Sequence, residues 1–139
     1  MRKLLLVVVP FILYSCSKGS DSSSTPVTPP AAVVEASIAF SVNVDPGSGV
    51  VLPVVGTSQP IIVKISSALP SAGVTIAVTV TKDADNSAVF TNSISAVNAD
   101  NNITITGLTP GVLSTATIVV TSKSTSTNTK TLIFKLAAK

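Results

Sequence analysis

Few residues of this chain can do nucleophilic or acid–base chemistry. Its 139 residues contain no His, a single Cys at position 16 and six Asp or Glu residues. Nucleophilic catalysis needs a base beside the nucleophile, so the Ser-His-Asp and Cys-His arrangements are ruled out. Ser15 and Lys18 have S-x-x-K spacing, but that motif needs both residues on one helix, and we treat the match as chance. The sequence therefore predicts a protein that is not an enzyme, with no catalytic residues.

The carboxylates offer one candidate metal site. Paired-carboxylate catalysis needs two acids held at a fixed separation, whereas those of this chain fall in expected turns or near an end. Asp83-Ala84-Asp85-Asn86 could supply oxygen ligands to Ca²⁺, but it lacks the Gly and distal Glu of the helix-loop-helix calcium loop. Asp and Asn are also typical of hairpin turns, which we favour here. Asp83 and Asp85 remain the metal candidates, and no cofactor is expected.

The first sixteen residues have the pattern of an export signal. Positively charged Arg2 and Lys3 precede an apolar run from Leu4 to Leu13. A membrane-spanning helix needs about 20 apolar residues, so this run is typical of a signal peptide. The following Leu13-Tyr14-Ser15-Cys16 resembles the lipobox of bacterial lipoproteins, with Tyr14 in place of the commonest small residue. The resemblance implies that residues 1–15 are cleaved and that Cys16 is lipidated, with diacylglycerol on its thiol and a further acyl chain such as palmitate on its amino group.

Two acyl chains or more hold a protein on a bilayer far more firmly than one chain does. The alternative is an ordinary secretory signal that leaves Cys16 as a free thiol. Residues 17–21 (SKGSD) are similar to the start of many lipoproteins of the Bacteroidota, in which acidic residues after the Cys favour the outer face of the outer membrane. Asp21 is the single acidic residue in this segment. We expect a lipid-anchored protein of the cell envelope in the outer membrane, and the choice between the periplasmic and surface faces stays open.

A tether is expected between the lipid anchor and the folded domain. Residues 17–30 read SKGSDSSSTPVTPP and are dominated by Ser, Thr and Pro. Such a segment buries too little apolar surface to offset the entropy of ordering it. In polyproline geometry it could reach roughly 40 Å. We therefore assign residues 16–34 to a disordered tether and residues 35–139 to the domain.

From residue 35 onward the hydrophobic pattern has a period of two, which is typical of half-buried strands. Pro53 interrupts one short apolar run and predicts an edge strand or a kinked strand there. A turn is expected over residues 98–102, and a long polar loop over Thr121–Thr131. The expected strands cover residues 38–44, 50–55, 61–65, 74–81, 103–105, 116–120 and 132–136, and two weaker strand signals fall at residues 88–91 and 94–97.

Seven or eight short strands separated by turn residues predict an all-β fold, an antiparallel β-sandwich. Residues 103–111 (ITITGLTPG) resemble the crossing between strands E and F in fibronectin type III and related immunoglobulin-like (Ig-like) domains. Those domains usually place a Tyr shortly afterwards, about where this chain has Ser114. The resemblance implies an Ig-like sandwich, and another Greek-key or jelly-roll arrangement is the alternative.

Charge and aromatic content restrict the possible partners. Without Arg2 and Lys3, seven Lys face six carboxylates, and they form no basic patch of the kind that binds nucleic acid. Phe40 and Phe134 alternate with polar neighbours, which indicates core positions, whereas Phe90 is less certain. An aromatic platform for sugars is therefore not favoured. Thr121–Thr131 is either a solvated hairpin or a contact loop.

The sequence thus favours a membrane-anchored envelope lipoprotein that displays a non-enzymatic Ig-like structural or binding module. Its expected partners are the membrane, through lipid on Cys16, and an envelope protein of unknown identity. Two alternatives stay open. One is an accessory binding subunit of an outer-membrane uptake or secretion complex. The other is a self-associating surface or adhesion subunit.

Overall fold

Eight β-strands make up the part of the chain that the structure, a computed structural model, describes, residues 34–139. Residues Val33–Lys139 form one compact unit. The expected signal segment, Cys16 and nearly all of the expected tether lie outside the described residues. Within these residues no helix is long and apolar enough to cross a membrane. The strands are β1 (Phe40–Val42), β2 (Val51–Val54), β3 (Gln59–Ile65), β4 (Val74–Lys82), β5 (Ala88–Ala96), β6 (Asp100–Ile105), β7 (Leu113–Ser122) and β8 (Thr129–Ala138).

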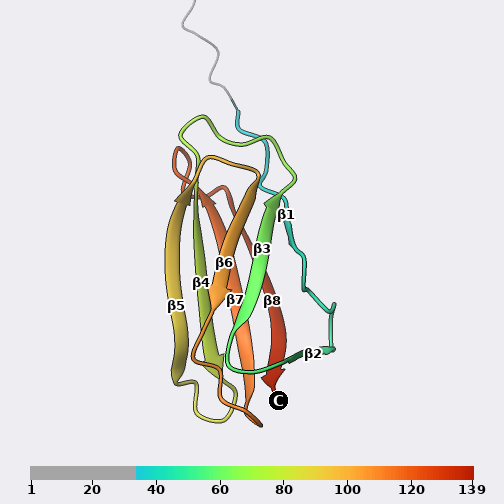
Figure 1. Ribbon diagram of the computed structural model, residues 1–139. Helices are drawn as coiled ribbons and strands as arrows, with labels where there is room; N and C mark the ends of the chain where they lie inside the picture. The colour runs from blue at the N-terminus through green and yellow to red at the C-terminus, as the bar shows by residue number, and fades with distance from the viewer. Residues whose placement is uncertain (1–33) are drawn as a thin grey trace, which may run out of the picture. The chain divides into compact units, whose positions relative to one another are not determined.

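The strands form two sheets that face each other (Figure 1). One sheet has three strands in the order β1-β3-β6, and the other has five in the order β2-β8-β7-β4-β5. All pairs are antiparallel except β2 with β8, which is parallel. The prediction of an all-β sandwich with seven or eight strands is confirmed.

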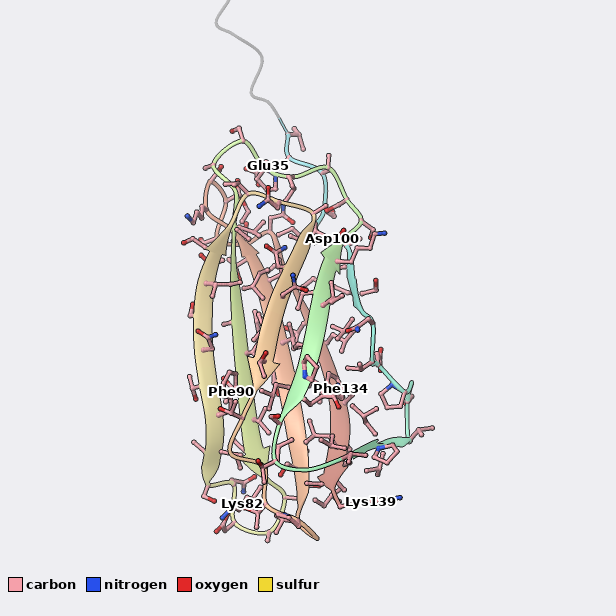
Figure 2. The ribbon with its side chains drawn as sticks, in the orientation of Figure 1. Glu35, Lys82, Phe90, Asp100, Phe134 and Lys139 are labelled. Carbon is pink, nitrogen blue, oxygen red and sulfur yellow. The ribbon has the colours of Figure 1, made fainter. Side chains whose placement is uncertain are left out.

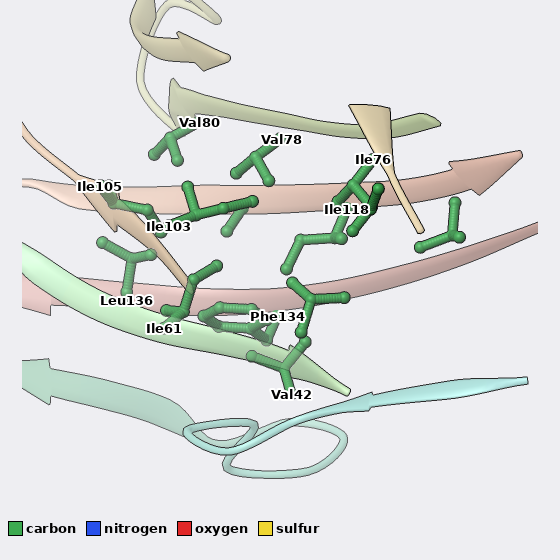
Figure 3. Packing of buried hydrophobic residues seen from close by; sticks show 14 of the residues in the cluster. Val42, Ile61, Ile76, Val78, Val80, Ile103, Ile105, Ile118, Phe134 and Leu136 are labelled. Carbon is green, nitrogen blue, oxygen red and sulfur yellow. The ribbon is translucent and has the colours of Figure 1, made fainter. Parts of the chain in front are cut away.

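Strict alternation of side chains builds the core between the sheets. In β4, Val74, Ile76, Val78 and Val80 are fully buried, whereas the residues between them are only half-buried. The inward faces of β3, β6, β7 and β8 follow the same rule, since successive side chains of a strand point to opposite faces. Figure 3 shows the two inner faces meeting in one layer. That layer includes Ile61, Ile103, Ile105, Ile118, Phe134 and Leu136.

Of the two alternatives expected at Pro53, an edge strand or a kinked strand, the structure shows an edge strand. β2 lies at one margin of the five-stranded sheet and pairs only with β8. Proline has no N–H to donate, so it is tolerated where one side of a strand has no partner. Val54 closes this end of the core, and the Lys139 N–H donates to its carbonyl at 2.9 Å.

Several expected boundaries are wrong. The two short strands expected at residues 88–91 and 94–97 are one strand, β5, because eight of its nine residues pair with β4, Asn92 and Ser93 among them, and a register shift opposite Val80 and Thr81 skips only Val89. The expected turn over residues 98–102 is shorter, since β6 already starts at Asp100. The loop expected over Thr121–Thr131 shrinks to residues 123–128, because its polar flanks belong to the β7–β8 hairpin.

Gly73 shows why a tight turn precedes β4. Its φ is +78°, and an added Cβ would lie 2.5 Å from the carbonyl oxygen of Ala96. L-residues with a side chain rarely adopt this conformation, whereas glycine does so at little cost. The position therefore fixes how closely the start of β4 approaches the end of β5.

Candidate functional site

The β7–β8 loop forms one end of the sandwich and is folded onto itself. The Ser122 hydroxyl oxygen accepts hydrogen bonds from the N–H groups of Ser124 at 3.1 Å and Thr125 at 3.2 Å. The Asn128 N–H donates to the Thr125 carbonyl at 2.9 Å. These short-range bonds give the six-residue loop a defined shape, as Ser and Asn side chains commonly do in turns.

Asn128 joins this loop to the first residues of the domain. Its Oδ1 accepts from the Ile38 N–H at 3.0 Å. Its Nδ2 donates to the Ala36 carbonyl at 2.9 Å and to Glu35 Oε2 at 3.2 Å. One amide side chain therefore fixes the start of the folded chain against a hairpin about ninety positions later.

Glu35 completes this contact with a carboxylate. Hydrogen bonds from the Ser122 side chain, and also from Asn128, Ser124 and Thr125, hold the pKa of Glu35 below its ordinary value against the opposing effect of burial. A carboxylate that accepts several hydrogen bonds is stabilised in its charged form. We call these residues, Glu35, Ser122, Ser124, Thr125 and Asn128, the entry clamp.

A hollow of about 580 Å³ adjoins the entry clamp. Glu35, Ser124 and Thr125 supply polar groups to its lining, and Leu69 and Pro70 supply apolar surface. This combination could hold a small polar group by hydrogen bonds, but it has no paired acid and base. Its lining is Val34, Glu35, Ala36, Ala68, Leu69, Pro70, Ser71, Ser124 and Thr125.

Asp83 and Asp85, the sequence-based metal candidates, bind different partners. Asp83 accepts a 2.6 Å hydrogen bond from the Thr115 hydroxyl and forms an ion pair with Lys135. These bonds, first that of Lys135 and then that of Thr115, lower the pKa of Asp83. Asp85 instead accepts from the Ser87 N–H at 2.9 Å, and hydrogen bonds from Ser87 lower its pKa. Among residues 34–139, no three His, Cys, Asp or Glu residues come together as a metal would require.

A smaller hollow of about 280 Å³ lies beside the ion pair on the outer face of the five-stranded sheet. Thr115 and Lys135 line it together with the loop that follows β1. Sequence reasoning missed both this cluster and the entry clamp, because their members are far apart along the chain. The lining of the smaller hollow is Asp45, Gly47, Ser48, Gly49, Val50, Thr115, Ile133, Phe134 and Lys135.

The three phenylalanines of the domain pack with the core. Phe134 is buried, and Phe40 and Phe90 are half-buried against the core cluster. The core positions predicted for Phe40 and Phe134 are therefore confirmed, and the uncertain Phe90 joins them. Figure 2 places Phe90 on the β5 side of the sandwich and Glu35 and Lys82 at its opposite ends.

Comparison with known proteins places the chain in no family. No family model matches it, and no curated protein matches it. Among solved structures it is similar to the sensor domain of the anti-sigma factor RsgI4 of Pseudobacteroides cellulosolvens. A short form of that domain is 18% identical, with a TM-score of 0.43, over 75% of this chain and 98% of that one. The solution structure of the domain is 17% identical, with a TM-score of 0.41, over 72% of this chain and 76% of that one.

Proposed function

We propose that this protein is an envelope lipoprotein in which lipid on Cys16 and the tether display a non-enzymatic Ig-like domain. The observation that carries the proposal is Leu13-Tyr14-Ser15-Cys16 directly after an apolar run of signal-peptide length. The compact unit that starts at Val33 supports a division into an anchoring segment and a displayed domain. We also propose that the lipid anchors this protein in the outer membrane.

The strand order supports an Ig-like sandwich. In Ig-like domains the sheets contain strands A, B and E on one side and C, F and G on the other. Here β1, β3 and β6 occupy the positions of A, B and E, and β4, β7 and β8 occupy those of C, F and G. β5 follows as an additional strand beside β4, and β2 corresponds to a second segment of strand A that has crossed to the opposite sheet.

The carboxylates support a role other than catalysis. A general acid that works near neutral pH needs a raised pKa, which burial in apolar surroundings supplies. Hydrogen bonds instead lower the pKa of Glu35, Asp83 and Asp85. This direction is typical of carboxylates that hold structure together.

The entry clamp lies at one end of the sandwich. The described chain begins at Val34, and Glu35 lies at the same end as the β7–β8 loop (Figure 2). The opposite end carries the turn after Lys82 and the chain terminus at Lys139.

The anchor is tested in living bacteria with Cys16→Ala and the matched control Ser17→Ala. We expect the full-length protein to incorporate a labelled fatty acid and to fractionate with membranes. Cys16→Ala should lose the label and leave the membrane fraction after a salt wash, whereas Ser17→Ala should keep both properties. Salt-resistant membrane association of Cys16→Ala would contradict the proposal.

A further inference from the structure

The five-stranded sheet ends at β5 with a free edge. β5 pairs with β4 on one side and with no strand of the described residues on the other (Figure 1). Such an edge presents N–H and C=O groups that can pair with a further strand.

The hydrogen bonding of neighbouring strands identifies the groups that face outward. The Gly73 carbonyl accepts from the Lys123 N–H at 3.1 Å, on the β7 side of β4. Backbone groups of successive residues point to opposite sides of a strand. Val74 therefore points its N–H and C=O toward β5, where it pairs with Ala96. By the same alternation along β5, the outward-facing groups belong to Thr91, Ser93 and Ser95.

The β5 edge lacks the features that protect the other edges. β1 has only three residues, β2 contains Pro53, and β6 has six residues and begins with the charged Asp100. β5 has nine residues (AVFTNSISA), with no charge and no proline. Natural edge strands commonly avoid pairing through short length, charge or proline. One end of β5 is approached by the next loop, since a Cβ at Gly107 would lie 3.2 Å from the Val89 carbonyl oxygen. The accessible edge therefore starts at Phe90.

The sequence of β5 is nearly symmetric about Asn92. Small hydroxyl residues stand next to it on both sides, Thr91 and Ser93, and large apolar residues follow, Phe90 and Ile94. A two-fold interface requires a surface that complements itself. We propose that the free edge of β5 pairs antiparallel with β5 of a second copy of this chain, about a two-fold axis at Asn92.

This register satisfies both backbone and side chains. Thr91 of one copy lies opposite Ser93 of the other, and both turn their N–H and C=O groups outward, so they can exchange two hydrogen bonds. Phe90 lies opposite Ile94, and both are half-buried apolar residues that gain further cover. No like charges meet, because β5 carries none. The two five-stranded sheets become one continuous sheet.

The pairing deepens the proposed display role, because tethered domains on one membrane meet at a high effective concentration. The test uses residues 33–139 without the anchor, so that a failure of pairing is seen separately from a failure of lipid attachment. The hydrophobic core lies wholly inside this segment. In sedimentation velocity we expect a dimer whose population grows between about 10 µM and about 1 mM.

Ser93→Pro tests the edge directly. The N–H of Ser93 faces away from β4. Proline at this position therefore removes an outward donor and leaves the hydrogen bonds between β4 and β5 intact. We expect Ser93→Pro to stay monomeric throughout the concentration range with an unchanged far-UV circular dichroism spectrum. Ser93→Ala keeps the backbone and should dimerise as the native sequence does. A native domain that stays monomeric, or a folded Ser93→Pro variant that still dimerises, would overturn the proposal.

The register is tested by oxidative cross-linking of Asn92→Cys. The chain's single Cys lies outside residues 33–139, so the new thiol has no competitor. Across the proposed axis the two Cα atoms at position 92 would be about 4.5 Å apart, which suits a disulfide. We expect the covalent dimer of Asn92→Cys to form at least tenfold faster than that of Thr104→Cys. Thr104 is an exposed position on β6. Equal rates for the two variants would overturn this register.

Discussion

The inner and outer faces of β4 and β7 use opposite kinds of side chain on the same backbone. On the inner face Val78 pairs with Ile118, and neither has any exposed surface. On the outer face Thr79 pairs with Thr117, and both are half-buried. The free energy gained by hydrophobic burial is proportional to the apolar area removed from water, so the inner face supplies most of the stability. The outer face contributes smaller cross-strand interactions.

The largest expected effect is at Ile118. Ile118→Ala removes a fully buried side chain and leaves a cavity, which typically costs about 2–5 kcal/mol. Thermal unfolding should shift down by the order of 10 °C or more. The matched control Thr117→Ala, one residue away on the outer face, should cost less than about 1 kcal/mol. Equal losses of stability in the two variants would contradict this difference between the faces and indicate a partner that covers the outer face.

An intermediate effect is expected at the end of the sheet, where Asn128 holds the start of the domain. Asn128→Ala leaves the Ile38 N–H and the Ala36 carbonyl without their partner, which costs about 1–3 kcal/mol when such groups stay unsatisfied. Urea unfolding measures the loss, with Asn102→Ala on the exposed side of β6 as the control. A loss no larger than that of Asn102→Ala would mean that water replaces the clamp.

The smallest expected effect belongs to Asp83 on the outer face. Lys135 and Thr115 lower its pKa from the ordinary value of 3.8, so the folded state releases this proton more readily than the unfolded state. The stabilisation is therefore present above pH 3.8 and is lost as the pH falls through the lower folded value.

Asp83→Asn should accordingly be slightly less stable than the native sequence near neutral pH, and the difference should shrink in acid. Denaturant unfolding of both proteins at about pH 7 and about pH 2.5 measures it, on either side of the ordinary carboxyl pKa. Asp100→Asn provides the control for simple loss of a negative charge. A difference that grows in acid would contradict the assigned direction of the pKa shift.

Sequence patterns predicted the faces of strands better than their ends. Alternation placed Ile61, Ile76 and Ile118 correctly in the core, because the period of two reflects the pleat itself. The length of β5 was missed because Asn92 and Ser93 have low strand propensity, which pairing with β4 overrides. The predicted β7–β8 loop is too long for a similar reason. The polar residue Thr129, expected in this loop, belongs to β8, where it pairs with Thr121.

The class of fold, the core residues and the hypothesis of a lipid anchor at Cys16 could all be inferred without the structure. Each depends on residues that are neighbours along the chain, where periodicity and motif spacing can be observed directly. The parallel pairing of β2 with β8, the entry clamp around Asn128 and the partners of Asp83 are visible only in the folded domain. These contacts join segments separated by tens of residues. Their geometry follows from how the two sheets close over a shared core, because burying the apolar faces fixes which polar groups meet at the rims.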